Sequence, residues 1–206
     1  MSVFGDLTTR TDVEGAVIAH LQAWMPTYIA EVERQQGYDA RALPMIGSYT
    51  VIAGAWEKWP ADQFPALLVF SPGLAEPPRG EGAGPVRAKW ACGIAAITEG
   101  GGTDPNLSAR KTAGAYFAAV RGALLQHQSL GGFAKGVSWT DERYDQIPSD
   151  QERSLATAYG MFSVEVAQAL DRSGGVADPL DNPYEEPDPW PTAQTMSAEV
   201  TPDGTT

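Results

Sequence analysis

Cysteine and histidine are nearly absent from this chain of 206 residues, which contains one cysteine and two histidines. A single cysteine, Cys92, excludes an intramolecular disulfide and a cysteine-based zinc site. Cys92 falls on the inward side of an alternating strand pattern, which favours a small buried hydrophobe over a nucleophile. His20 and His127 lie on different predicted helices without metal-ligand spacing. His20 lies beside an apolar stripe and is expected on the helix surface or at the boundary of that stripe, not in a catalytic role. We predict no catalytic residue, no cofactor and no metal site.

Long apolar runs and positive charge are also scarce. The longest apolar stretches, residues 66–70 and 90–97, are too short to span a bilayer. No apolar run follows a basic start at the N-terminus, so we expect synthesis and assembly in a reducing cytoplasm, with no membrane partner. Lys and Arg number 14 against 26 Asp and Glu, giving a net charge of −12. Such a chain has no general attraction for phosphates, so DNA is not expected as a specific ligand but can pass nearby without sticking.

The end of the chain, residues 174–206, contains neither Lys nor Arg but has seven carboxylates and six prolines. A segment this acidic and poor in apolar residues cannot bury enough surface to offset its ordering entropy. We therefore predict a disordered acidic extension over residues 174–206 and a single domain over residues 1–173. Trp190 is the one large aromatic side chain between prolines in this extension, and it is either a docking anchor for a partner or incidental.

The N-terminal part of the domain has the pattern of an amphipathic helix. Thr11 and Glu14 have capping-box spacing, and Gly37 is a suitable stop. Pro26 predicts either a kink near Trp24 or two separate helices. The apolar residues recur at steps of three and four and form one predicted buried stripe: Val13, Val17, Leu21, Trp24, Tyr28 and Val32.

Strand patterns follow this helix. A weak one covers Ser48–Gly54, and a buried one covers Pro65–Phe70 and ends at Ser71-Pro72-Gly73. Residues 72–85 are dense in Gly and Pro and predict a long loop, a place where binding residues often lie. Val86–Thr98 then alternates between apolar and other residues, which predicts a half-buried strand and hence an extended hairpin.

The second half of the chain predicts one more helix and two more strands. Asp104 and Pro105 are suitable for the N-cap and first position of a helix over Asp104–Gln128. Strands are predicted around Gly136–Thr140 and Leu155–Leu170, joined by the polar stretch Asp141–Glu152. The predicted buried residues of the helix are Ala113, Phe117, Val120 and Leu124. The order of elements predicts an α+β fold, an antiparallel or mixed sheet of four to five strands against two main helices.

This arrangement resembles the tail-terminator proteins of long-tailed bacteriophages, the group that includes minor tail protein U. The similarity covers residues 10–170. It lies in the first helix, the Pro65–Phe70 strand with its Ser-Pro-Gly end, the next strand Val86–Thr98, the second helix, and a final strand pair that ends at Val166. The resemblance implies a virion protein that forms a ring, usually of six subunits, at the head-proximal end of the tail tube. The ring would stop tube polymerisation and join the tail to the head. Its partners would be copies of itself, the major tail tube protein and a head connector or stopper protein, with DNA passing through the channel.

Contacts between subunits would then use loops, exposed aromatics and sheet edges. The candidate interface residues are Trp56, Trp59, Phe64, Pro72, Glu76, Arg79, Glu81, Arg87, Lys89, Asp141, Arg143 and Asp145. Three alternatives remain: another connector or stopper of the neck, a metal-dependent enzyme that uses the carboxylates of residues 141–152, and a monomeric adaptor that recruits a partner through residues 174–206. Against the metal-dependent enzyme, Arg143 and Arg153 already supply counter-charges to the carboxylates of residues 141–152, which favours a solvated loop over a metal site.

Overall fold

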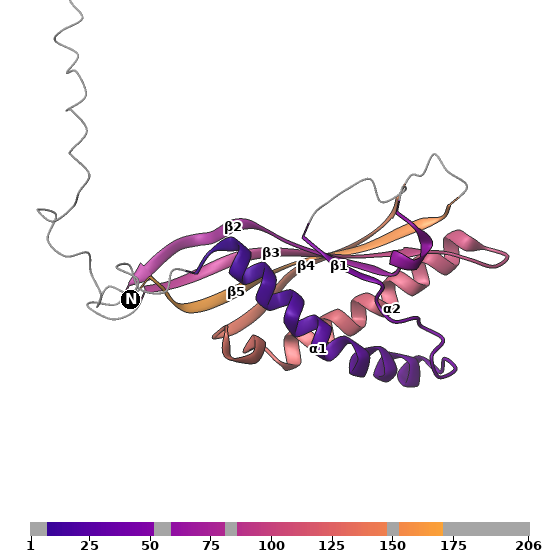
Figure 1. Ribbon diagram of the computed structural model, residues 1–206, viewed down its shortest axis with the longest axis horizontal. Coiled ribbons are helices and arrows are strands. Elements are labelled where there is room, and N and C mark those ends of the chain that lie inside the picture. Colours follow the sequence, from indigo (N-terminus) through magenta and orange to yellow (C-terminus); the bar gives the residue numbers. More distant parts are fainter. Residues whose placement is uncertain (1–7, 52–58, 81–85, 148–152, 171–206) are drawn as a thin grey trace, which may run out of the picture.

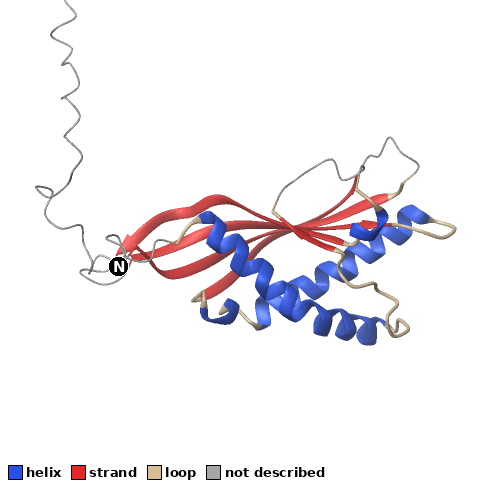
Figure 2. Cartoon of the chain, viewed as in Figure 1, coloured by secondary structure: helices blue, strands red, loops and turns tan. Residues whose placement is uncertain are grey.

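The computed structural model describes residues 8–51, 59–80, 86–147 and 153–170. Two helices lie on one face of a twisted five-stranded mixed sheet, with strand order β1-β2-β3-β5-β4 (Figures 1 and 2). The elements are α1 (Arg10–Gln36), β1 (Ser48–Thr50), η2 (Ala61–Gln63), β2 (Ala66–Gly80), β3 (Val86–Glu99), α2 (Pro105–Gln126), η3 (Leu130–Gly132), β4 (Gly136–Ile147) and β5 (Leu155–Leu170). The predicted α+β fold is confirmed. The predicted acidic extension over residues 174–206 lies outside the described residues.

Helix α1 begins two residues earlier than its predicted capping pair indicated. Its N-cap is Thr9, whose side chain accepts from the amide of Asp12, while the Asp12 carboxylate accepts from the Thr9 amide at 2.7 Å. The capping box therefore uses Thr9 and Asp12, and the prediction of Thr11 and Glu14 was wrong. At the other end Gly37 has φ of +69°, a left-handed conformation that glycine adopts without strain, which confirms the predicted stop.

The buried stripe of α1 differs from the prediction at two positions. Met25 and Ile29 are buried, whereas Trp24 is 36% exposed and Tyr28 is only partly buried. The helix continues through Pro26 as one element, so the two-helix alternative was wrong, although its axis changes direction part-way along (Figure 1). Trp24 and Tyr28 instead contact the C-terminal end of α2: Trp24 stacks on His127, and the Tyr28 hydroxyl donates to Gln126 at 2.7 Å.

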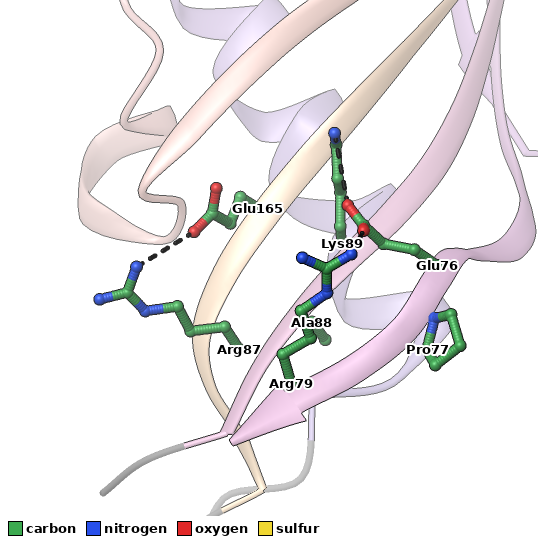
Figure 3. A pocket seen from close by; sticks show the side chains of 7 residues that line it. All are labelled: Glu76, Pro77, Arg79, Arg87, Ala88, Lys89 and Glu165. Atoms are coloured by element: carbon green, nitrogen blue, oxygen red, sulfur yellow. Dashed lines mark hydrogen bonds and ion pairs between the residues drawn. The ribbon is translucent and has the colours of Figure 1, made fainter. Parts of the chain in front are cut away.

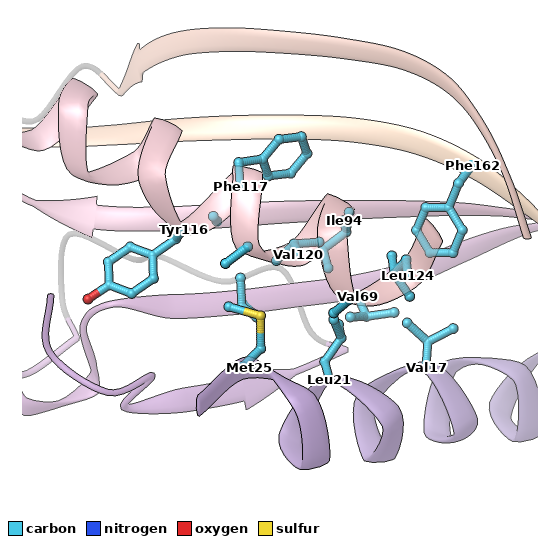
Figure 4. Packing of buried hydrophobic residues seen from close by; sticks show 14 of the residues in the cluster. Val17, Leu21, Met25, Val69, Ile94, Tyr116, Phe117, Val120, Leu124 and Phe162 are labelled. Carbon is cyan, nitrogen blue, oxygen red and sulfur yellow. The ribbon is translucent and has the colours of Figure 1, made fainter. Parts of the chain in front are cut away.

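Helix α2 follows the prediction closely. The Asp104 side chain accepts from the amide of Leu107, and Pro105 occupies the first turn, where a missing N–H costs nothing. The four predicted core residues, Ala113, Phe117, Val120 and Leu124, are all buried. They pack between the sheet and α1, against Leu21 and Val69 among others (Figure 4). In the part of the chain that the structure describes, neither helix is long and apolar enough to cross a membrane.

Strand β2 does not end at Ser71-Pro72-Gly73 as predicted but continues to Gly80. Its register with β3 shifts after Phe70 and twice more before Arg79, so the prolines of this segment fall among bulges. Strand β1 pairs only with Ala66–Leu68, which leaves the rest of β2 at an edge of the sheet. An edge strand tolerates proline because the missing N–H would have no partner there. The predicted loop is thus largely a strand. Strands β2 and β3 continue together to Gly80 and Val86, with β5 beside β3, and we call this end of the sheet the arm.

Strand β4 is also longer than predicted, because it continues through Asp141 to Ile147 instead of ending at Thr140. Its register with β5 shifts between Trp139 and Asp141 and is regular afterwards. The polar composition that predicted a linker is the composition of an exposed edge strand, where charges hinder unwanted pairing with other chains. Strand β5 has the predicted bounds.

Candidate interaction surface

The two faces of the sheet have different surroundings. The register places Val69, Ile94 and Gly160 in one row across β2, β3 and β5, and this row faces the helices. The next row, Phe70, Gly93 and Met161, faces the other way. Both described α-helices lie on the first face and neither covers the second (Figure 1), where Leu68, Ala95 and Ile97 are buried but Phe70 and Met161 are partly exposed. We call this second face the open face.

The centre of the open face is aromatic and apolar. The ring of Phe70 on β2 stacks with that of Tyr159 on β5 at a centroid distance of 6.1 Å, across Gly93 of the strand between them. Met161, two residues further along β5, lies on the same face. All three side chains are partly exposed. We call Phe70, Tyr159 and Met161 the aromatic patch; contiguous apolar groups of this kind on a sheet surface typically mark contacts with other proteins.

Charged residues of the arm adjoin this patch. Lys89 on β3 lies between Glu76 on β2 at 3.5 Å and Glu165 on β5, and Arg87 approaches Glu165 at 3.8 Å. Arg79 donates to Glu76 at 2.7 Å. These residues line a shallow hollow of about 240 Å³ (Figure 3). We call the five residues the arm patch: Glu76, Arg79, Arg87, Lys89 and Glu165.

The opposite edge of the open face is the row of β4 that contains Asp141, Arg143 and Asp145. The register places these three residues opposite Met161, Tyr159 and Thr157 of β5. Arg143 is 71% exposed in its side chain and donates to Asp141 at 3.0 Å. The alternate residues of β4 face the helices instead, and Glu142 accepts from Arg121 of α2 at 2.7 Å. The acidic stretch is therefore divided between a solvent-facing row and a helix-facing row.

The far end of the open face is closed by a side-chain cluster. Arg153 donates through Nε and Nη2 to both carboxylate oxygens of Glu99, each at 2.7 Å, and through Nη1 to the carbonyl of Trp59. Its guanidinium lies 5.1 Å from the centre of the Phe64 ring. The hydrogen bonds from Arg153 lower the pKa of Glu99. Trp59 and Phe64, which are partly buried here, act as a cap on this end of the domain.

The two histidines meet at the interface of α1 and α2, which sequence spacing did not reveal. His20 is buried, and its Nε2 donates to the carbonyl of Ala123 at 3.1 Å. His127 lies 6.0 Å from His20 between ring centres and stacks on Trp24 at 3.6 Å. Burial, together with the nearby His127, lowers the pKa of His20, against the opposing effect of the Ala123 hydrogen bond. This cluster stabilises the contact between the helices.

Cys92 is fully buried on the helix side of β3, as predicted. Burial raises the pKa of its thiol to about 12, so almost no thiolate exists at neutral pH and the residue is a poor nucleophile. Among the described residues, no group of three or more His, Cys, Asp and Glu side chains is close enough to hold a metal ion.

The structure separates the predicted interface residues into three places. Glu76, Arg79, Arg87 and Lys89 lie together in the arm patch, with Pro72 exposed nearer the base of the arm. Trp59 and Phe64 lie at the closed end, while Asp141, Arg143 and Asp145 lie on β4. Trp56 and Glu81 lie outside the described residues.

The aromatic patch and Glu165 were the functional candidates that sequence reasoning missed. A signal existed, because the alternation of β5 that buries Phe162 and Val164 places Met161 and Tyr159 on the opposite face, where polar residues are usual. No protein family profile matches the chain, and no curated protein matches it significantly.

Proposed function

We propose that this chain is a structural ring protein of the neck of a long-tailed bacteriophage, the tail terminator. In this role copies of the chain close into a ring on the head-proximal end of the tail tube and stop its growth. The ring also presents a surface to the head connector. The finished protein would reside in the virion, after assembly in the host cytoplasm.

The observation that carries the proposal is the open face with its aromatic patch. A monomeric sandwich of sheet and helices normally covers both faces of its sheet or keeps the uncovered face polar. Here Phe70, Tyr159 and Met161 are the partly exposed centre of the face that neither α-helix covers, with the arm patch at one side and the β4 charges at another. An apolar centre with a charged rim is the usual composition of a protein contact surface.

Two further observations favour a ring over an open sheet polymer. The free part of β2 contains Pro72 and three register shifts, and β4 presents Asp141, Arg143 and Asp145 after its own shift. Both edges are thus poorly suited to continuous strand pairing with another copy. Head-to-tail contacts through side chains of the open face would close into a ring where the rotation between neighbouring copies divides a full turn. The net charge of −12 also suits a channel through which DNA slides without binding.

The test combines purified protein with tail tubes assembled from the major tail tube protein of the same phage. The proposed role predicts that the protein binds tube ends, limits tube length and sediments with the tubes as a ring. The substitution Met161→Arg should abolish capping without unfolding the domain, because it places a charge in the centre of the contact. Lys111→Glu, a charge change at an exposed position of α2 away from the open face, is the control and should cap normally.

A protein that binds only the capsid portal, and leaves tube length unchanged, is instead a connector or stopper. Normal capping by Met161→Arg would show that the open face is not the contact surface. A measurable turnover that depends on Asp141 or Asp145, with capping unaffected, would favour the enzyme alternative.

A further inference from the structure

The arm patch has an imbalance of charge at its end. The register places Arg79 directly opposite Arg87, and like charges at facing positions of neighbouring strands repel. The next row, which contains Glu76, Lys89 and Glu165, holds both carboxylates of the patch. Arg79 and Arg87 reach back to these carboxylates while their side chains remain 80% and 56% exposed. The guanidinium groups at the end of the arm can therefore donate to further carboxylates that approach from solvent.

The chain itself supplies a segment of matching charge at this position. Leu170, the last residue of β5, pairs with Val86, one residue before Arg87. The last described residue thus lies at the end of the arm, and residues 171–206 follow it in the sequence. From residue 174 onward they contain seven carboxylates and no Lys or Arg.

We propose that the acidic segment 174–206 docks on the arm patch of its own chain, with its carboxylates on Arg79, Arg87 and Lys89. A single exposed ion pair contributes at most about 1 kcal/mol. Tethering changes this balance, because a short linker holds the segment at an effective concentration of about millimolar. Several weak pairs then suffice for substantial occupancy. The docked segment would neutralise the exposed cations of a chain whose proposed position is next to DNA, although the docking does not depend on that proposal.

The experiment uses the full chain with a nitroxide spin label on Thr192→Cys, since buried Cys92 does not react under native conditions. The proposal predicts strong broadening of the backbone amide signals of residues 79, 87 and 89 at low ionic strength. The broadening should disappear at about 0.5 M salt, where the screening length falls below about 5 Å. It should also disappear in the double variant R79E/R87E, whose fold is checked by the unchanged amide shifts of α2. The double variant R110E/K111E, with the same charge change on exposed positions of α2, is the matched control and should retain the broadening.

A mixture of spin-labelled, unenriched protein with unlabelled, isotope-enriched protein distinguishes docking of the segment on its own chain from docking on a neighbouring copy. Broadening that occurs when one and the same protein is spin-labelled and isotope-enriched, but not in the mixed sample, supports docking within one chain. Broadening of equal strength in the mixed sample means that the segment docks on a neighbouring copy and overturns the proposal. Absence of broadening at the arm, or equal broadening in R79E/R87E, overturns it as well.

Discussion

The ring of Phe70 lies so close to Gly93 that a β-carbon built on that glycine would come within 2.3 Å of the ring carbon Cζ. The glycine leaves the space in which Phe70 reaches across β3 to stack on Tyr159. Gly160 has the same role on the opposite face, where a β-carbon would lie 2.6 Å from both Phe117 and Trp139. Two adjacent strands therefore each use a glycine to admit aromatic rings: Gly93 admits Phe70 on one face of the sheet, and Gly160 admits Phe117 and Trp139 on the other.

Adding a methyl group at these two glycines should have unequal costs. Gly160→Ala overpacks a site where Phe117 is fully buried, and we expect it to destabilise the domain by about 1–3 kcal/mol. Gly93→Ala should cost less, because the partly exposed Phe70 ring can turn outward into solvent. Urea unfolding followed by far-UV circular dichroism measures both changes.

Gly15→Ala is the control for these substitutions, because nothing lies within 4 Å of its added carbon and the residue lies inside α1, beyond its first turn. It should stabilise the domain by about 0.5–1 kcal/mol through helix propensity. A larger cost for Gly93→Ala than for Gly160→Ala would contradict the assignment of the open face, since it would mean that Phe70 cannot move.

A second prediction concerns Glu14, a buried carboxylate that joins α1 to the arm. Its Oε1 accepts from the backbone amide of Ser71 at 2.7 Å and from Nε of Arg10 at 2.8 Å. Glu14→Ala leaves the buried Ser71 amide without this acceptor, which should cost about 1–3 kcal/mol. Glu14→Gln keeps an acceptor oxygen and should cost less.

The control for Glu14 is Arg10→Ala, which removes the exposed partner and should change the free energy of unfolding by less than about 1 kcal/mol. Chemical denaturation at neutral pH compares all three variants. An equal effect of Arg10→Ala and Glu14→Ala would show that the ion pair, and not the amide of Ser71, accounts for the stabilisation.

Local signals in the sequence predicted the parts of the fold that depend on local physics. Asp104 starts α2 by accepting from the Leu107 amide within one turn, and Pro105 follows at a position that needs no N–H. Gly37 ends α1 through its own positive φ. The bounds of β5 follow from its alternation. Such features need no knowledge of distant residues, so a single sequence suffices for them.

The errors occur where tertiary position overrides composition. Pro72 marks a loop in most contexts, but here it lies in an edge segment that β1 leaves unpaired. Asp141 appears polar enough for a linker, yet the edge position of β4 makes that polarity compatible with a strand. The aromatic patch joins β2 and β5 across β3, and the strand order that brings them together is not encoded in any local pattern.

A third prediction concerns how the stabilisation by the Arg153–Glu99 ion pair depends on pH. The guanidinium of Arg153 lowers the pKa of Glu99 below its usual 4.5, so the pair stabilises the folded state above that pH. This stabilisation is lost as pH falls through the lower folded-state pKa. Arg153→Met should therefore cost about 1.5–3 kcal/mol at neutral pH, the range of hydrogen bonds to charged groups, and progressively less below about pH 4.5.

The matched variant for Arg153 is Arg143→Met, which breaks the exposed pair with Asp141. It should cost less than about 1 kcal/mol at neutral pH. Denaturant unfolding at several pH values gives both series. A gap between wild type and Arg153→Met that stays constant down to about pH 3 would rule out Glu99 as the group responsible.

The last prediction concerns His20, whose burial and proximity to His127 lower its pKa from 6.5. The unfolded chain then binds more protons than the folded chain below pH 6.5, so the free energy of unfolding should fall as pH decreases from there through the folded-state pKa. His20→Gln cannot titrate but retains a donor for the Ala123 carbonyl, so its stability should depend less on pH between about 7.5 and 5.5. Carboxylates that titrate over the same range affect both proteins equally and cancel in the comparison. If the two pH profiles run parallel, the buried imidazole does not resist protonation, and the contact between α1 and α2 must accommodate the charged ring.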